Sequence, residues 1–254
     1  MSQSLNISGP SFQIAASLQL PEDEVQLWRI DLDAIRDDES RWHKLLSSDE
    51  STRASRFHFS RDRQCFAASR AVLRTILASY LASDPRSLIF SYSNKEKPSL
   101  APQAGADITF NVSHSGGIAL FAFSRRREIG VDVEHVRRDF DVEAIAGRFF
   151  SAHELAQLAA IPAEQRVDAF FRCWTRKEAY IKATGEGLSL PLSQFDVSME
   201  PGEKSALQAT RPDSSEAGRW LLQEVPAGAG FIAALCVRGR DWKLKEWSEN
   251  RGAS

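Results

Sequence analysis

The sequence predicts an α+β protein made of two similar halves. Two long segments, 48–81 and 142–184, carry apolar residues at helical spacing, and shorter runs between and after them are rich in β-branched and aromatic residues. The helical segments share a weak similarity, since C-F-A-A-S-R-A-V-L-R at 65–74 can be laid on C-W-T-R-K-E-A-Y-I-K at 173–182. Because a repeated segment implies a repeated structural unit, we expect a pseudo-dimer of two α+β halves; the alternative is a chance similarity.

Each element is predicted from a local pattern. Residues 25–32 alternate as in a strand, and the segment 142–184 is interrupted near Pro162 and ended by Gly185 and Gly187. The other strand candidates are 88–92, 108–112, 118–123, 129–133, 195–199, 220–225, 231–237 and 242–247. The S-R-R-R-E string between 118–123 and 129–133 predicts a hairpin, and the polar stretch 201–219 predicts a mobile loop.

The composition is that of an ordinary globular protein. We expect residues 1–20 to form a loose N-terminal segment, 21–126 the first half and 127–254 the second half. The formal net charge of −2 gives no sign of nucleic-acid binding, and no apolar run is long enough to cross a membrane. Three widely spaced cysteines and the absence of a signal-peptide pattern favour a cytoplasmic protein.

Two groups of acidic side chains are candidates for chemistry. In I-G-V-D-V-E, 129–134, Asp132 and Glu134 point to one face of a strand because side chains alternate. On the helical segment Trp174, Glu178 and Lys182 share one face. The simpler interpretations are a solvated acidic strand and a core tryptophan beside an i,i+4 ion pair. The alternative is that the acids hold Mg2+, which takes one or two protein carboxylates plus phosphate oxygens and water.

A third group lies in F-N-V-S-H-S-G-G, 110–117, where a strand runs into a turn. Glycine allows close backbone approach to a ligand, and hydroxyls, N–H groups and an imidazole suit a phosphate. A structural role for His114 is the alternative. Taken together, acids for a metal, cations and a glycine turn provide what pyrophosphate chemistry needs.

These motifs resemble a known family. S-H-S-G at 113–116, G-V-D-V-E at 130–134 and W-T-R-K-E-A-Y-I-K-A-T-G-E-G-L at 174–188, with A-G-R-F-F-S-A-H-E at 146–154, are similar to the signature of the surfactin-synthetase-activating type of 4′-phosphopantetheinyl transferase. The match extends from about residue 45 to residue 197. The resemblance implies a pseudo-dimer whose active site lies at the junction of the halves, with the metal site carried by the second half.

The resemblance also implies roles for single residues. Asp132, Glu134 and Glu178 resemble the magnesium ligands, with Mn2+ as a substitute metal, and Glu178 and Lys182 the catalytic pair. The implied contacts to coenzyme A are Arg53, Lys97, Ser113, His114, Lys177 and Lys182. Glu50 departs from the pattern because some members carry lysine there, so Arg56 or Arg70 are candidate substitutes for a phosphate contact.

The implied reaction transfers the phosphopantetheine arm of coenzyme A to a serine of an acyl or peptidyl carrier protein and releases adenosine 3′,5′-bisphosphate. The base is Glu178 or a metal-bound hydroxide, and the sequence leaves both open. There are two rival functions: a nucleotide pyrophosphatase, which would use the same acids with water as nucleophile, and a catalytically idle carrier-binding protein. We expect a monomer that binds neither nucleic acid nor membranes.

Carrier proteins of this system resemble small acidic helical bundles, which implies a basic docking surface. We expect that surface near His135, Val136, Arg137, Arg138, Arg148, Phe149 and Phe150. The arginines at 125–127 on the preceding turn are expected nearby. The alternative places Phe149 and Phe150 in the core and leaves the arginines solvated.

Overall fold

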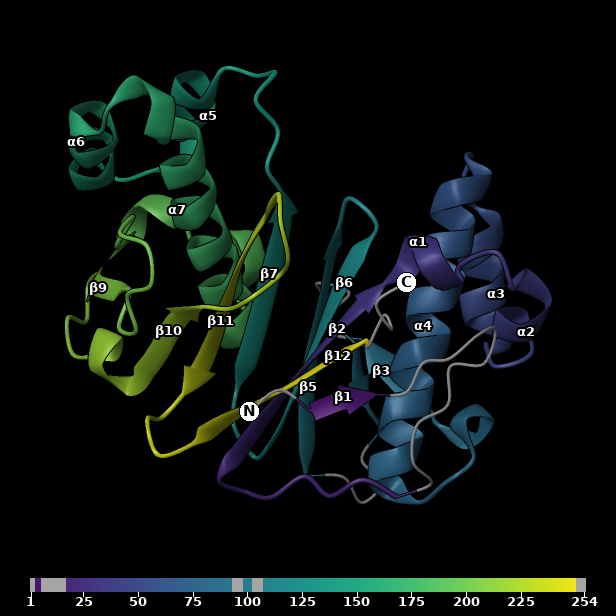
Figure 1. Ribbon diagram of the computed structural model, residues 1–254. Coiled ribbons are helices and arrows are strands. Elements are labelled where there is room, and N and C mark those ends of the chain that lie inside the picture. The colour runs from purple at the N-terminus through teal and green to yellow at the C-terminus, as the bar shows by residue number, and fades with distance from the viewer. Residues whose placement is uncertain (1–2, 6–16, 93–97, 102–106, 250–254) are drawn as a thin grey trace.

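The protein consists of two halves with the same order of elements, as the computed structural model shows for residues 3–5, 17–92, 98–101 and 107–249 (Figure 1). The order is strand, long helix, strand, strand. The first half contains β2 (Glu24–Asp31), α4 (Ser60–Leu81), β5 (Ile108–Ser115) and β6 (Ile118–Arg125). The second contains β7 (Ile129–His135), α7 (Ala163–Thr184), β10 (Trp220–Glu224) and β11 (Phe231–Arg238).

The two sheets also have equivalent strand orders. The last strand of each half lies in the middle of an antiparallel sheet, which gives β2-β6-β5 in the first half and β7-β11-β10 in the second. This shared topology confirms the predicted α+β pseudo-dimer.

Shorter elements complete the described part of the chain. In the first half they are β1 (Gln3–Leu5), α1 (Leu32–Ile35), α2 (Glu39–His43), α3 (Ser48–Ser55), η1 (Pro85–Ser87), β3 (Phe90–Tyr92) and β4 (Pro98–Leu100). In the second half they are α5 (Val142–Phe149), α6 (Ala152–Ala160), η3 (Gly187–Ser189), η4 (Leu192–Gln194), β8 (Phe195–Val197), β9 (Leu207–Thr210) and η5 (Glu216–Arg219), followed by β12 (Lys243–Glu249). None of the described helices is long and apolar enough to span a membrane.

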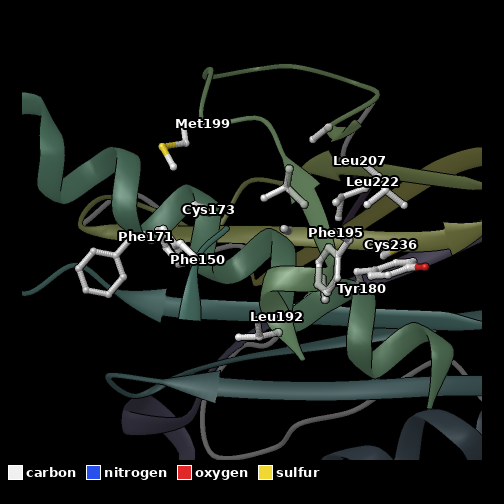
Figure 2. Packing of buried hydrophobic residues seen from close by; sticks show 14 of the residues in the cluster. Phe150, Phe171, Cys173, Tyr180, Leu192, Phe195, Met199, Leu207, Leu222 and Cys236 are labelled. Atoms are coloured by element: carbon white, nitrogen blue, oxygen red, sulfur yellow. The ribbon is translucent and has the colours of Figure 1, made fainter. Parts of the chain in front are cut away.

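The layers run helix, sheet, sheet, helix, with α4 and α7 on the outside (Figure 1). One apolar core lies between α4 and the first sheet, and a second surrounds α7, with Phe150, Tyr180 and Phe195 among its aromatic side chains (Figure 2). A third core joins the inner faces of the two sheets and includes Leu27 and Leu120 from one half and Val131 and Leu235 from the other. The halves are therefore held together by buried apolar surface, which favours a fixed junction between them.

The two predicted helical segments are each divided. Residues 48–81 form two helices, α3 and α4, with a non-helical segment at 56–59 between them. Ser47 and Glu50 form a capping box at the start of α3. Residues 142–184 form α5, α6 and α7; a second capping box at Ser151 starts α6, and Pro162 caps α7 as the sequence suggested. The helix α7 ends at Gly185, whose φ of 75° is the left-handed conformation that glycine adopts easily.

The predicted hairpin at 118–133 is wrong. Strand β6 already has β2 and β5 on its two edges, and β7 pairs with β11 instead. Because a strand has only two edges, β6 cannot also pair with β7. The chain therefore crosses from one sheet to the other at the short turn 126–128.

Two predictions about the ends of the chain also need correction. Strand β12 lies within the predicted second half, yet it pairs in parallel with β2 of the first sheet. Strand β1 falls in the segment that was expected to be loose, and it pairs with β12.

The predicted loop at 201–219 contains β9 and η5, with β9 paired to β8.

Candidate active site at the junction of the halves

Strands β5 and β7 lie side by side where the two halves meet, although they share no backbone ladder. Polar side chains of β5 take the place of that ladder. Asn111 Oδ1 accepts from the Val131 N–H at 2.8 Å, Ser113 Oγ from the Val133 N–H at 3.4 Å, and Ser115 Oγ from the His135 N–H at 3.1 Å. We call Asn111, Ser113 and Ser115 the β5 seam. It satisfies the outward N–H groups of β7 and fixes that strand against the first half.

The helix α7 packs directly on β7 at Gly130. A side chain at this position would have its Cβ about 2.1 Å from the carbonyl oxygen of Ala179, so only glycine permits this approach. The close packing brings Lys182 over β7, where its Nζ donates to Asp132 Oδ1 at 2.6 Å and to Ser113 Oγ at 3.2 Å. Residues from both halves thus meet at one point.

Asp132 is the most buried acid of this group, with 3% of the residue exposed. Its Oδ1 accepts from Ser113 Oγ at 2.8 Å as well as from Lys182. Its Oδ2 is buried and has no hydrogen-bond partner among the described residues. A buried carboxylate oxygen without a donor is costly, and a cation is the partner that would best satisfy it.

The two other predicted acids are half-buried, and their titration is perturbed. Burial, followed by the charge of Asp132, raises the pKa of Glu134, although the hydrogen bond from Ser115 Oγ to Glu134 Oε2 at 2.9 Å opposes this. Burial also raises the pKa of Glu178; Lys182 opposes that shift, and Asp132 and Glu134 add to it. The charges of Asp132 and Glu134 thus act on Glu178, which places the carboxylate on α7 within electrostatic reach of the two on β7.

These residues fit a hard divalent cation. Their oxygens are the ligands that Mg2+ prefers, their charges repel one another, and Asp132 Oδ2 lacks a partner. In the described part of the chain no group of three or more His, Cys, Asp or Glu side chains is arranged to hold a metal ion. Mg2+ takes one or two protein carboxylates and keeps water and phosphate oxygens as its other ligands.

The opposite face of β5 borders a different space. Because side chains alternate along the strand, His114 points away from Ser113 and lines a cavity of about 280 Å³ together with Phe57, Arg61, Gly116 and Gly117. Partial burial of the ring, followed by the charge of Lys182, lowers the pKa of His114. Ser113 and His114, both expected to contact coenzyme A, therefore lie on opposite faces of β5, and the Ser113 hydroxyl binds Asp132.

A larger cavity of about 750 Å³ lies along α3. Phe57 borders both cavities, and Arg53, Arg56 and Tyr92 line the larger one. Glu50, which departs from the family pattern, also lines it, with 1% of the residue exposed, and binds Arg74 at 2.7 Å. Among the described residues, the cations that line this space are Arg53 and Arg56.

Arg70, the other suggested substitute, lies within the first half. Its Nε is 3.5 Å from Glu50, its side chain is only 10% exposed, and its guanidinium lies over the rings of Phe66, Phe90 and Tyr92. Lys97 lies outside the described residues.

Lys177 does not belong to the site. It is fully buried in the second half, where its Nζ binds the carbonyl oxygens of Leu192 and Phe195 at 2.7 Å each and Glu154 at 2.8 Å. These three partners use all three donors of the ammonium group. The expectation that Lys177 contacts coenzyme A is therefore wrong for this structure, and Lys177 instead anchors α7 to the segment around β8.

The predicted docking residues divide between surface and core. Phe150 is buried and stacks on Phe170, so the alternative interpretation holds for it (Figure 2). Phe149 is 36% exposed and, with Arg148, borders a cavity of about 230 Å³.

The remaining docking residues lie at the end of β7 or just after it. His135, Arg137 and Arg138 are exposed, and Val136 is half-buried against the second core. The arginines at 125–127 lie at the opposite end of β7, so the expectation that they are near this surface is wrong.

Sequence reasoning assigned no role to Asn111 or Ser115. Both belong to the β5 seam, and Ser115 binds one of the candidate metal ligands. The signal was present in N-x-S-x-S, because polar residues at every second position of a strand lie on one face.

Two family models match this chain and together cover both halves. Residues 128–236 match the 4′-phosphopantetheinyl transferase superfamily, and residues 33–126 match the N-terminal region of a 4′-phosphopantetheinyl transferase. The 4′-phosphopantetheinyl transferase HetI of Nostoc sp. is 40% identical over 232 residues, which are 91% of this chain and 94% of that protein.

More distant relatives match over a similar extent. The 4′-phosphopantetheinyl transferase Sfp of Bacillus subtilis is 28% identical over 82% of this chain and 88% of its own length. The L-aminoadipate-semialdehyde dehydrogenase-phosphopantetheinyl transferase of Mus musculus is 27% identical over 78% of this chain and 69% of its own.

The fold, the acidic junction and these matches define a transferase that acts with coenzyme A and carrier proteins. The chain belongs to the 4′-phosphopantetheinyl transferase superfamily.

Proposed function

We propose that the protein transfers the 4′-phosphopantetheine group of coenzyme A to a serine of an acyl or peptidyl carrier protein in an Mg2+-dependent reaction that releases adenosine 3′,5′-bisphosphate. The observation that carries this proposal is the meeting of Asp132, Glu134, Glu178 and Lys182 at the junction of the halves. Membership in a transferase family favours transfer over the pyrophosphatase and the idle carrier-binding protein.

In this proposal Asp132, Glu134 and Glu178 hold the metal ion. The ion would neutralise the negative charge of the pyrophosphate when bound. Lys182 adds a positive charge at the same place, since its side chain is 28% exposed and can reach a ligand as well as Asp132. Asp132 Oδ2 supports the metal assignment, because this buried acceptor has no hydrogen-bond partner among the described residues and a metal ion would supply one.

The nucleotide part of coenzyme A would occupy the two cavities that Phe57 connects. His114 borders the end near the acids, and Arg53 and Arg56 line the far end, where a phosphate would find two guanidinium groups. Strand β5 would then serve both parts of the site, because His114 faces the nucleotide while the seam faces the acids.

Glu178 is the residue that we assign as proton acceptor. The pKa of its carboxyl is raised by burial and by the acids on β7, which suits a group that must take a proton from a serine hydroxyl. The negative charge on the serine oxygen then forms only as it attacks the β-phosphate of coenzyme A.

The carrier would dock on the surface that extends from β7 to α5. Arg137, Arg138 and Arg148 are exposed there, and Phe149 offers an apolar contact next to a small cavity. A basic rim around an apolar centre attracts and orients an acidic partner.

The test is incubation with coenzyme A, Mg2+ and a panel of apo carrier proteins, followed by intact-mass analysis. We expect one carrier to gain the mass of a phosphopantetheine group, and carriers with the target serine replaced by alanine to gain nothing. Release of adenosine 3′,5′-bisphosphate without any carrier would instead indicate hydrolysis. Failure of every carrier to gain mass would contradict the proposal.

A further inference from the structure

Two serines of the β5 seam make the same pair of contacts with β7. Ser113 Oγ donates to Asp132 Oδ1 at 2.8 Å and accepts from the Val133 N–H at 3.4 Å. Ser115 Oγ donates to Glu134 Oε2 at 2.9 Å and accepts from the His135 N–H at 3.1 Å. Each hydroxyl therefore binds one carboxylate together with the backbone N–H of the residue that follows it.

This arrangement fixes the direction of the hydroxyl proton. A serine hydroxyl has one proton to donate and lone pairs with which to accept. In each serine one lone pair accepts a hydrogen bond from a backbone N–H of β7. The hydroxyl proton then points in another direction, which here is towards the carboxylate. The orientation of the carboxylate is then tied to the backbone of β7.

The two serines differ in what else they contact. Ser113 also receives a hydrogen bond from Lys182, so its substitution would disturb several groups at once. Ser115 binds Glu134, and its hydrogen bond lowers the pKa of that acid against the effect of burial. It is therefore the seam residue whose effect can be attributed to one carboxylate.

We propose that Ser115 is a positioning residue for Glu134, which holds the carboxylate in the orientation that binds Mg2+. The inference rests on the proposed function, since it takes Glu134 as a metal ligand. Groups that hydrogen-bond a metal ligand orient it, and their removal commonly weakens metal binding by about 10- to 100-fold. Ser115 makes no contact with substrate in this scheme, because its hydroxyl is occupied by the acid and the backbone.

The experiment measures Mn2+ binding by electron paramagnetic resonance on the full chain, without coenzyme A or carrier. Ser115→Ala is expected to weaken Mn2+ binding by about 10- to 100-fold. Ser115→Thr keeps the hydroxyl on a strand position that tolerates β-branched residues, so it should bind Mn2+ like the wild type. The control is Ser124→Ala, since Ser124 is likewise a strand serine but is buried and donates to the carbonyl oxygen of Arg127.

A double variant separates positioning from a general structural role. If Ser115 acts through Glu134, Ser115→Ala should cause no further loss of Mn2+ binding when Glu134 is already glutamine. A further loss of the same size in that background would show that Ser115 acts through another group and would overturn the proposal. Thermal unfolding of each variant checks that the fold is kept; the His135 N–H lies at the surface, where water can replace the lost acceptor.

The two levels of the argument fail in different ways. Equal Mn2+ affinity of Ser115→Ala and wild type overturns the role of Ser115 and leaves the proposed transfer untouched. Absence of Mn2+ binding by the wild type overturns the metal assignment and the role of Ser115 together, while intact-mass analysis of the carrier still decides the transfer itself.

Discussion

Replacement of Lys182 by methionine would remove the ammonium group from Asp132 while keeping most of the apolar length of the side chain. The Lys182 Nζ lies 2.6 Å from Asp132 Oδ1, and the acid is almost fully buried. In the absence of metal, this lysine is the cation that binds that acid. The variant is therefore expected to be less stable than the wild type when no metal is present.

The size of the effect follows from the burial of the two partners. Removal of one partner of a fully buried ion pair costs about 3–5 kcal/mol. Lys182 is 28% exposed and Ser113 still donates to the same oxygen, so we expect a smaller loss, about 1–3 kcal/mol. For a chain of this size each kcal/mol lowers the melting temperature by about 2–4 °C, which gives a decrease of about 2–12 °C.

The assay is thermal unfolding in EDTA and in excess Mg2+, without coenzyme A. A bound ion stabilises the native state more when its affinity is higher. Because the variant offers Asp132 without a competing ammonium group, Mg2+ should raise its melting temperature more than that of the wild type. Lys204→Met, which alters an exposed lysine on the loop before β9, is the matched control. Equal melting temperatures of Lys182→Met and wild type in EDTA, with an equal response to Mg2+, would refute this reasoning.

Three further predictions concern other parts of the molecule. Lys177→Met should destabilise the protein by about 3–5 kcal/mol, because it leaves a buried acid unpaired, while the folded fraction keeps its affinity for coenzyme A in calorimetry. The raised pKa values of Glu134 and Glu178 mean that these two carboxyls bind more protons in the folded chain than in the unfolded one; their contribution to metal-free stability should therefore fall as pH rises from about 4.5 through the folded pKa values, as seen in urea unfolding, and Mg2+ should oppose the fall. Arg138→Glu with Arg148→Glu should slow modification of an acidic carrier and flatten its salt dependence without changing coenzyme A binding; unchanged carrier kinetics would place the docking surface elsewhere.

Local patterns predicted what depends on neighbouring residues. The alternation in I-G-V-D-V-E predicted that Asp132 and Glu134 share a face, and both acids do bind the seam on β5. Helical spacing predicted that Glu178 and Lys182 share a face of α7. The charge of Lys182 opposes the rise in the pKa of Glu178, which agrees with this prediction. In these cases the period of the element alone fixes where a side chain points.

The same spacing could have excluded Lys177. On α7 it lies four residues after Cys173 and four before Ile181, both of which are buried, so it belongs to the apolar stripe of the helix. The family motif suggested a contact between Lys177 and coenzyme A, whereas the apolar stripe places Lys177 in the core. What the sequence could not supply was Glu154, the acid on α6 that neutralises the buried ammonium group.

Strand pairing was the part that local patterns could not supply. The short turn after β6 favours a hairpin, but β2 and β5 take both edges of β6 through pairings that depend on distant parts of the chain. Likewise nothing within β12 indicates that it returns to the first sheet. The polar face N-x-S-x-S could be recognised in the sequence, but the strand that it contacts could not, because β5 and β7 are brought together only by these distant pairings.

The course of β12 explains why only one half carries the acidic site. Strands β2 and β7 are equivalent in the shared topology, and each has one edge paired with the central strand of its sheet. The other edge of β2 is filled by the backbone of β12, which leaves no N–H groups there for side chains to bind.

The corresponding edge of β7 has no backbone partner among the described strands and is met by Asn111, Ser113 and Ser115 instead. The helices differ accordingly. The cation of α4 that the internal similarity matches to Lys182 is Arg74, which is buried against Glu50, whereas Lys182 stays partly exposed against Asp132. The edge of β7 is thus closed by polar side chains rather than by another strand, and a serine hydroxyl there can accept from the backbone and donate to a carboxylate at the same time.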